Sequence, residues 1–349
     1  MTRARDVANV LTAASNLATD TETAAAISTH AALSDPHAGY LKESEYVAAG
    51  KNKIINGDFG IWQRGTSFTT AVYTADRWHM SWSGTTTFSL TRQAFTAGSA
   101  PVAGYESQYF ARFARTAGSA DDYFLQRIED ARTFAGQTVT LSFWAKASAS
   151  TTISQVYCAQ SMGSGGSGGS GAGSFSGISI TTSWARYSVT FVMPSIAGGT
   201  VGTNSFVETV FKFGSAMGNI TVDLWGVQLE AGSQATPYHN ATPNQQAELA
   251  ACERYYEVIG GTSTAGITIG GVATGASQAF YFPYSFRTTK RTTPTLSKTG
   301  TWGISNATQP QVAFPQTSGF TLYGQSLASG MWYVQADSVD DTIIASAEL

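Results

Sequence analysis

Most of the chain after residue 50 alternates apolar and polar residues with a period of two, which is the pattern of a half-buried β-strand. Such stretches recur between Lys51 and Tyr238 and again between Val258 and Leu349, with clusters of Gly, Pro, Ser and Asn between them. Because those clusters favour turns, the pattern predicts many short antiparallel strands. The predicted fold is mostly β: a jelly-roll β-sandwich in residues 51–240 and a second, smaller C-terminal β-sandwich in residues 259–349.

Residues 1–50 break this pattern and predict a short N-terminal helical segment followed by a connector. Small and apolar residues recur at the spacing of a heptad; they are Val7, Val10, Ala14, Leu17, Thr21 and Ala24. Since half of this seam is small or polar, a lone helix would be marginal, whereas several copies side by side could bury it. The alternative is an Ala-rich helix that packs on a globular neighbour. The connector is predicted over residues 29–46, and Pro36 within it stops any helix that precedes that proline.

Residues 241–258 predict a linker helix between the two β-domains. Thr242 is suited to cap the helix, and Pro243 is suited to its first turn. One face of this helix gathers apolar and aromatic side chains at helical spacing; they are Leu249, Cys252, Tyr255 and Tyr256.

Composition narrows the classes of partner. Charged residues make up 12% of the chain, the net charge is −3, and there is no dense run of Lys and Arg, which argues against binding to nucleic acid. No apolar stretch approaches the length of a membrane span, and the N-terminus lacks the apolar core of a signal peptide. We therefore expect synthesis in a cytoplasm without membrane insertion. The two cysteines, Cys158 and Cys252, do not make a disulfide framework.

No common catalytic motif is present. The four histidines do not match HExxH, GxSxG is absent, and the GSGGSG in the glycine-rich run 162–177 lacks the strand and helix of a nucleotide-binding turn. Two carboxylates would suffice for a glycosidase. The candidates are Asp58, Asp76, Asp121, Asp122, Glu129, Asp130, Glu208, Asp223 and Glu230. Because no spacing singles out an acid and a base, we expect that the chain is not an enzyme.

Aromatic residues near turns are the candidate ligand contacts. Trp and Tyr rings can stack on the C–H-rich faces of sugars, while short polar side chains hold the hydroxyls. Trp82, Trp302 and Trp332 lie near Gly and Ser turns and, with Tyr323, are the predicted carbohydrate-binding residues. The remaining tryptophans lie within alternating strands and are predicted to be core; they are Trp62, Trp78, Trp144, Trp184 and Trp225.

The stretch INGDFGIWQRGTSFTTAVYTADRWHMSW, which begins at Ile55, contains acidic residues, arginines, a histidine and aromatic rings, which are residue types common in active sites. Its spacing matches no acid–base or ligand motif. We interpret it as structural: Asn56 and Gly57 turn into the first strand, and the tryptophans fill the core. Asp76 and Arg77 are predicted to satisfy the backbone or each other.

Three stretches together resemble tail-fibre proteins of tailed bacteriophages. NKIINGDFGIWQRGTSFTTAVYTADRW resembles the opening of a β-sandwich module of these fibres, and VDLWGVQLEAGSQATPYHNATPNQQAELAACERYYEV resembles its last strand and the link to the next domain. DPHAGYLKESEY resembles their connector. Glu253 stands where a glutamine is usual in the pattern. The resemblance covers residues 29–260, and the last domain matches only in its general β character.

The resemblance implies a homotrimeric subunit of a virion appendage. Residues 1–50 would attach it to other virion proteins, and the β-domains would bind a host-surface polysaccharide. Two alternatives remain open: a purely structural collar, head-fibre or decoration protein, and a glycan-cleaving tailspike.

The resemblance also implies a fold similar to carbohydrate-binding modules, some of which hold a structural Ca²⁺. Asp58 and Asp223 are the positions that could serve such an ion. His30 and His37 could form a metal site on a threefold axis, although two histidines from a single chain are too few for a closed zinc site. No other cofactor is expected.

Overall fold

The computed structural model describes residues 25, 27–29, 50–102, 107–118, 120–168, 171–261 and 266–349. The chain divides into two compact units, Met1–Tyr46 and Val47–Leu349. In the first unit, the described residues are helical and exposed. The predicted heptad, His30 and His37 lie outside the described residues. No helix within the described residues is long and apolar enough to cross a membrane.

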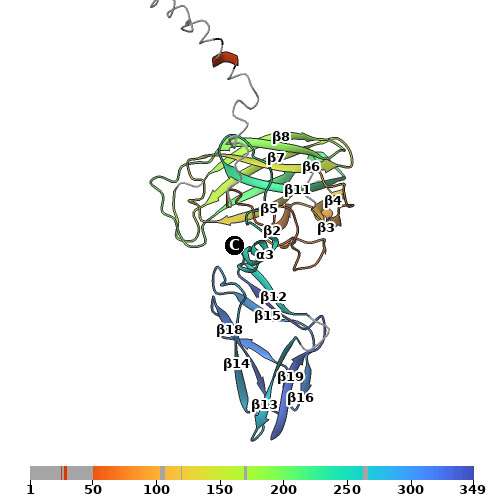
Figure 1. The fold of residues 1–349 in the computed structure, drawn as a ribbon, viewed down its shortest axis with the longest axis vertical. Helices are drawn as coiled ribbons and strands as arrows, with labels where there is room; N and C mark the ends of the chain where they lie inside the picture. The colour runs from red at the N-terminus through yellow and green to blue at the C-terminus, as the bar shows by residue number, and fades with distance from the viewer. Residues whose placement is uncertain are drawn as a thin grey trace, which may run out of the picture. The chain divides into compact units, whose positions relative to one another are not determined.

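Two antiparallel sheets form the first sandwich of the second unit (Figure 1). One sheet has the order β1-β3-β4-β11-β6-β9 and the other has the order β2-β5-β10-β7-β8. The strands are β1 (Ser67–Phe68), β2 (Trp78–Ser83), β3 (Thr86–Ala94), β4 (Tyr109–Gly118), β5 (Asp121–Glu129), β6 (Thr138–Ala147), β7 (Thr151–Ser161), β8 (Ala172–Ile180), β9 (Ala185–Val192), β10 (Phe206–Phe213) and β11 (Ile220–Ala231). A short 3₁₀ helix, η2 (Ser215–Met217), connects the last two of these strands.

The period-two pattern places the core between these sheets. On β10, Val207, Phe211 and Phe213 are fully buried, whereas Glu208 and Lys212 are partly exposed. Because successive side chains of a strand point to opposite faces, this alternation aims the apolar set into the sandwich. Trp62 and Trp78 belong to the same core, as predicted. Among the other tryptophans predicted to be core, Trp225 is fully buried, while Trp144 and Trp184 are only half-buried.

Three smaller antiparallel sheets follow, with the orders β12-β20-β15, β13-β19-β16 and β14-β18-β17. Their strands are β12 (Tyr256–Gly260), β13 (Ile267–Ala273), β14 (Ala279–Ser285), β15 (Thr295–Lys298), β16 (Gly303–Ser305), β17 (Gln311–Ala313), β18 (Gly319–Gln325), β19 (Gly330–Ala336) and β20 (Thr342–Ser346). They enclose a second core that contains Trp302 and Trp332. The prediction of a mostly β chain is therefore confirmed.

One helix, α3 (Gln245–Glu253), lies between the strands of the two cores. The sequence places its cap at Thr242, but Asn244 is the cap, and its side chain accepts a hydrogen bond of 2.9 Å from the Ala247 amide. The Thr242 hydroxyl instead donates to the Glu248 carboxylate. Cys252, on this helix, is fully buried, whereas Leu249, predicted on the same face, is 36% exposed.

The stretch that begins at Ile55 is structural, as interpreted from the sequence. Asn56 adopts a positive φ of 57°, and its side chain bonds the backbone of Ile61 and Asp76. Asp76 is fully buried, accepts a 2.7 Å bond from the Gln63 amide, and lies 3.7 Å from an Arg64 nitrogen. Burial raises the pKa of the Asp76 carboxyl, although Arg64 opposes that shift. The hydrogen bonds of these polar groups thus stabilise the turn.

The two arginines of this stretch contact Tyr255 and Tyr256, which follow α3, and Glu348, which follows β20. Arg77 pairs with Glu348 rather than with its neighbour Asp76, and Arg64 pairs with the same carboxylate at 2.7 Å. The guanidinium of Arg77 stacks 3.3 Å from the ring of Tyr255, and that of Arg64 stacks 3.5 Å from the ring of Tyr256. Residues far apart in the sequence therefore form one buried cluster of ion pairs and cation–π contacts.

Candidate functional site

The outer face of the β14-β18-β17 sheet carries a cluster of exposed aromatic rings. Tyr281 on β14 is directly opposite Tyr323 on β18, which is in turn opposite Gln311 on β17. Directly opposed residues share a face of the sheet. The rings of Tyr281 and Tyr323 have centroids 5.2 Å apart, and Phe314 lies 6.4 Å from Tyr281. We call Tyr281, Tyr323 and Phe314 the aromatic face.

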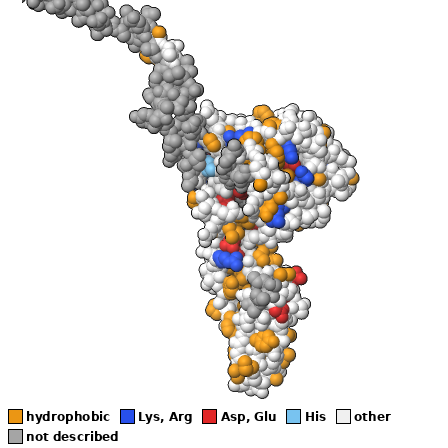
Figure 2. All heavy atoms as spheres, turned by 45° about the vertical axis from the view of Figure 1, so that its right-hand side comes forward, with side chains coloured by type: hydrophobic (Ala, Val, Ile, Leu, Met, Phe, Trp, Pro, Cys, Tyr) orange, Lys and Arg blue, Asp and Glu red, His pale blue; other side chains and the backbone are white. Residues whose placement is uncertain are grey.

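The alternation along β14 explains why this face exists. Phe280, Phe282 and Tyr284 pack against the second core, so Tyr281 and Pro283 point the other way. Tyr281 is 57% exposed and Phe314 is 67% exposed. Figure 2 shows hydrophobic side chains at the surface of the C-terminal strands, with few charged ones among them.

A hollow of about 220 Å³ adjoins the aromatic face. Phe314 lines both, and the next row of the sheet, Pro283 opposite Thr321, forms part of the wall. The remaining lining residues are Tyr284, Ser285, Gln316, Ser318, Gly319 and Phe320. The side chains of Ser285, Gln316 and Ser318 are exposed and make no hydrogen bond within the part of the chain that the structure describes. The site thus offers rings beside free hydroxyl and amide groups.

The site is uncharged. Neither residues 279–285 nor residues 311–325 contain an Asp, Glu, Lys or Arg. A charged ligand would have to shed water here without gaining a counter-charge, which costs free energy. The arrangement therefore suits a ligand with apolar C–H faces and neutral hydroxyls.

The structure corrects the sequence analysis on two of the predicted sugar-binding residues. Trp302 and Trp332 are 1% and 2% exposed. The prediction that their rings lie at the surface is therefore wrong. The Trp302 indole donates a 3.0 Å bond to Thr299 O, and the Trp332 ring packs 4.8 Å from that of Phe280. Both lie in the second core because a large ring at an inward-facing position fills the narrow space between short sheets.

The other two predicted residues have different surroundings. Trp82 is half-buried, and its ring packs on the first core, 5.2 Å from Phe88. Tyr323 is half-buried within the aromatic face. The sequence analysis missed Tyr281 and Phe314. The alternation in AFYFPYS could have predicted Tyr281, because it places that ring on the other face of the strand from Phe280 and Phe282.

Candidate carboxylates for an acid–base pair are engaged elsewhere. All of those named from the sequence except Asp58 lie within 4 Å of a cationic nitrogen. Asp58 accepts a 3.1 Å bond from the Gly60 amide. Burial raises the pKa of the Cys158 thiol to about 12, and it raises the pKa of Cys252 as well, so neither sulfur is a thiolate at neutral pH.

Among the described residues, neither Asp58 nor Asp223 belongs to a cluster of metal-ligating side chains. No group of three or more His, Cys, Asp or Glu side chains there is arranged to hold a metal ion. Asp223 is bound instead by two cations: Arg112 Nε at 2.7 Å and Lys146 Nζ at 3.6 Å. These cations neutralise the charge that would attract Ca²⁺.

No protein-family model and no curated protein matches this chain. Among solved structures, it is similar to the enzymatically active domain of tailspike protein 4 of bacteriophage CBA120, with 19% identity and a TM-score of 0.34 over 53% of this chain and 22% of that one. It is also similar to a family 11 carbohydrate-binding module of a Clostridium thermocellum cellulase (14% identity, TM-score 0.31, 50% of this chain and 98% of that one). The N-terminal cellulose-binding domain of Cellulomonas fimi β-1,4-glucanase C is comparable (15%, 0.32, 54% and 99%). These similarities are too low to assign a ligand or an activity.

Proposed function

We propose that this chain is a glycan-binding subunit of a bacteriophage appendage, and that the aromatic face and its hollow take a neutral polysaccharide of the host surface. The observation that carries the proposal is the exposure of Tyr281 and Phe314 beside uncharged polar groups. Sugar rings present C–H faces to aromatic planes and hydroxyls to amides and hydroxyl groups. This lining therefore suits both the C–H faces and the hydroxyls of a pyranose.

The assembly proposed from the sequence increases the effect of such a site. In a homotrimer attached to the virion through residues 1–50, three copies of the aromatic face would meet one polysaccharide surface. Linked weak sites gain avidity of about 10²-fold or more over one site, provided that they can engage together. Modest affinity at each face would then be enough for attachment.

We further propose that the chain binds its glycan without cleaving it. The ion pairs of the candidate carboxylates support this, because a general acid must be free to deliver a proton to the glycosidic oxygen. Incubation with the bound polysaccharide should leave its chain length unchanged, and shortened products would favour the tailspike alternative.

Affinity electrophoresis in gels that contain neutral glucans, galactans or mannans tests the binding site. We expect at least one polysaccharide to retard the chain, and Tyr281→Ala and Tyr323→Ala to abolish most of that retardation because each removes a stacking ring. Tyr333→Ala is the matched control, since Tyr333 is 45% exposed on a different sheet of the same region. Equal retardation of all variants would refute the site, and no retardation by any polysaccharide would favour the purely structural alternative.

A further inference from the structure

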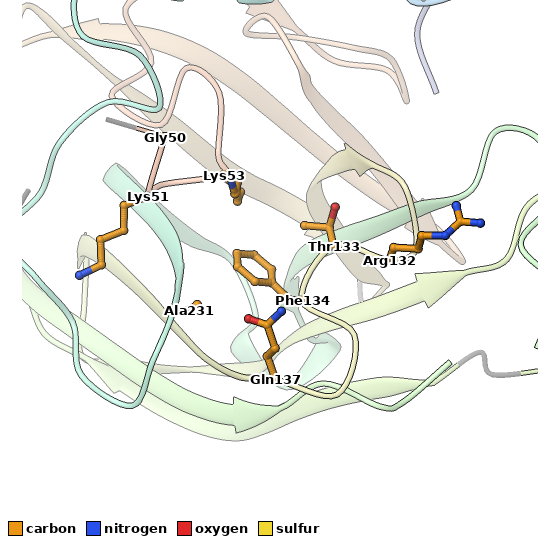
Figure 3. A pocket seen from close by; sticks show the side chains of 8 residues that line it. All are labelled: Gly50, Lys51, Lys53, Arg132, Thr133, Phe134, Gln137 and Ala231. Atoms are coloured by element: carbon orange, nitrogen blue, oxygen red, sulfur yellow. The ribbon is translucent and has the colours of Figure 1, made fainter. Parts of the chain in front are cut away.

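A second cavity lies in the first sandwich, away from the strands that carry the aromatic face. It has a volume of about 490 Å³ and lies between the first residues of the sandwich, the turn after β5 and the end of β11 (Figure 3). It is lined by Gly50, Lys51, Lys53, Arg132, Thr133, Phe134, Gln137 and Ala231. This volume falls within the range of about 300–1,000 Å³ that is usual for small-molecule sites.

The walls of this cavity are fixed by backbone hydrogen bonds. The Lys53 amide donates to Leu229 O at 3.0 Å, which ties the first wall to β11. In the turn, the amides of Thr133 and Gln137 donate to Asp130 O and Phe134 O at 3.0 and 2.9 Å. A site held in this way loses little conformational freedom when a ligand binds, so more of the contact energy is retained as affinity.

The charge of the lining is positive. Lys51, Lys53 and Arg132 contribute three cations and no acidic residue lines the cavity. Lys51 lies 3.2 Å from Glu230, and Arg132 lies 3.0 Å from Asp130. Lys53 forms no ion pair within the described residues and is exposed. One uncompensated ammonium therefore remains to attract an anion.

The remaining groups suit a sugar ring. Figure 3 shows the Phe134 ring in the cavity, with the Gln137 amide beside it and Lys53 across from it. The Gln137 side chain has no hydrogen-bonding partner in the described part of the chain. Phe134 is 6% exposed and belongs to the first core, so its ring is held rigidly in the wall.

We propose that this cavity binds a sugar residue that carries an anionic substituent, a carboxylate or a phosphate, of an acidic polysaccharide. The Lys53 ammonium pairs with the anion, the Gln137 amide bonds a hydroxyl, and the small exposed part of the Phe134 side chain contacts C–H atoms of the sugar. An acidic peptide would use the cation but not the combination of ring and amide. The site differs from the aromatic face in position and in charge, and it stands whether or not that face binds a glycan.

Calorimetric titration of the 349-residue chain at low salt tests the proposal. The probes are trigalacturonate, glucose 6-phosphate, the neutral galactotriose and hexaglutamate. We expect the chain to bind at least one of the two anionic sugars and to bind galactotriose at this cavity much more weakly. The tighter of the two anionic sugars then tells whether the cavity prefers a carboxylate or a phosphate. Affinity should fall as salt is raised, because the ammonium is exposed to solvent. Tighter binding of hexaglutamate than of either anionic sugar would overturn the proposal in favour of an acidic protein segment.

Variants then locate the binding. Lys53→Gln should weaken anionic-sugar binding by about tenfold, as expected for the loss of a charge-assisted hydrogen bond, and Gln137→Ala should weaken it less. Lys298→Gln is the matched control, because Lys298 also lacks an ion pair within the described residues but lies on β15. Tyr281→Ala should have no effect, which separates this site from the aromatic face. Unchanged binding in Lys53→Gln, or no binding of either anionic sugar, would refute the proposal.

Discussion

Gly57 shows how a single position in the opening stretch is fixed by a contact far away in the sequence. Its carbonyl accepts a 2.9 Å bond from the Val227 amide on β11. A Cβ placed on Gly57 would lie 2.2 Å from the Val227 carbonyl oxygen, far inside contact distance. The requirement here is for close approach of two backbones rather than for an unusual φ, so only a residue without a side chain fits.

Gly57→Ala should therefore destabilise the fold by about 1–3 kcal/mol, the usual cost of forcing extra atoms into a packed interior. Urea denaturation monitored by tryptophan fluorescence measures the change. Gly275→Ala is the matched control, because a Cβ there meets nothing within 4 Å, and it should change stability by less than about 0.5 kcal/mol. A similar loss in both variants would contradict the steric argument.

At the scale of the element, α3 shows that the start of a helix is decided by which side chain reaches the first free amides. Both Thr242 and Asn244 are suitable cap residues by type. The buried Glu248 carboxylate accepts bonds from the Asn56 amide, the Thr242 amide and the Thr242 hydroxyl. Thr242 is thereby engaged, and the helix begins after Asn244.

Asn244→Ala should cost about 0.5–2 kcal/mol of stability, because it leaves the Ala247 amide without its cap. Thermal unfolding followed by far-UV circular dichroism reports the loss. Gln246→Ala, on an exposed position of the same helix, should be neutral or slightly stabilising, because Ala has the higher helix propensity. A neutral Asn244→Ala would return the cap to Thr242.

At the scale of the whole molecule, two regions of the surface differ in charge and in the kind of side chain that they expose. The C-terminal strands carry an uncharged aromatic face, and the first sandwich carries a cavity with an excess of positive charge. A subunit with both could contact neutral and acidic sugars of one heterogeneous polysaccharide. Repetition of the subunit in a trimer would multiply both contacts.

Light scattering after size exclusion tests the proposed assembly. We expect the 349-residue chain to have three times the 36.8 kDa mass of one copy. A fragment of residues 51–349 that is monomeric would place the assembly in residues 1–50, and a trimeric fragment would place it between the β-domains. A monomeric 349-residue chain at high concentration would contradict the fibre proposal.

Sequence alone was sufficient for the features that depend on local pattern. Alternation along segments such as FVETVFKF predicted strands, because the side-chain period of a strand is fixed by its geometry. The same reasoning assigned Trp62 and Trp78 to the core and read the charged stretch that begins at Ile55 as structural. It also named Tyr323 as a candidate sugar contact; the structure places that ring beside Tyr281, and sugar binding by it stays a prediction.

Only the tertiary structure decided which face of each strand meets solvent and which distant groups meet each other. Trp302 and Trp332 lie near turns in the sequence, which predicted exposed rings, yet the small sheets enclose both. Tyr281 is exposed because its neighbours Phe280 and Phe282 face inward. The pairing of Arg77 with Glu348 joins residues that are 271 positions apart. The cavity beside Lys53 likewise brings together three separate segments. Such contacts depend on how sheets pack and pair, and no local period encodes that arrangement.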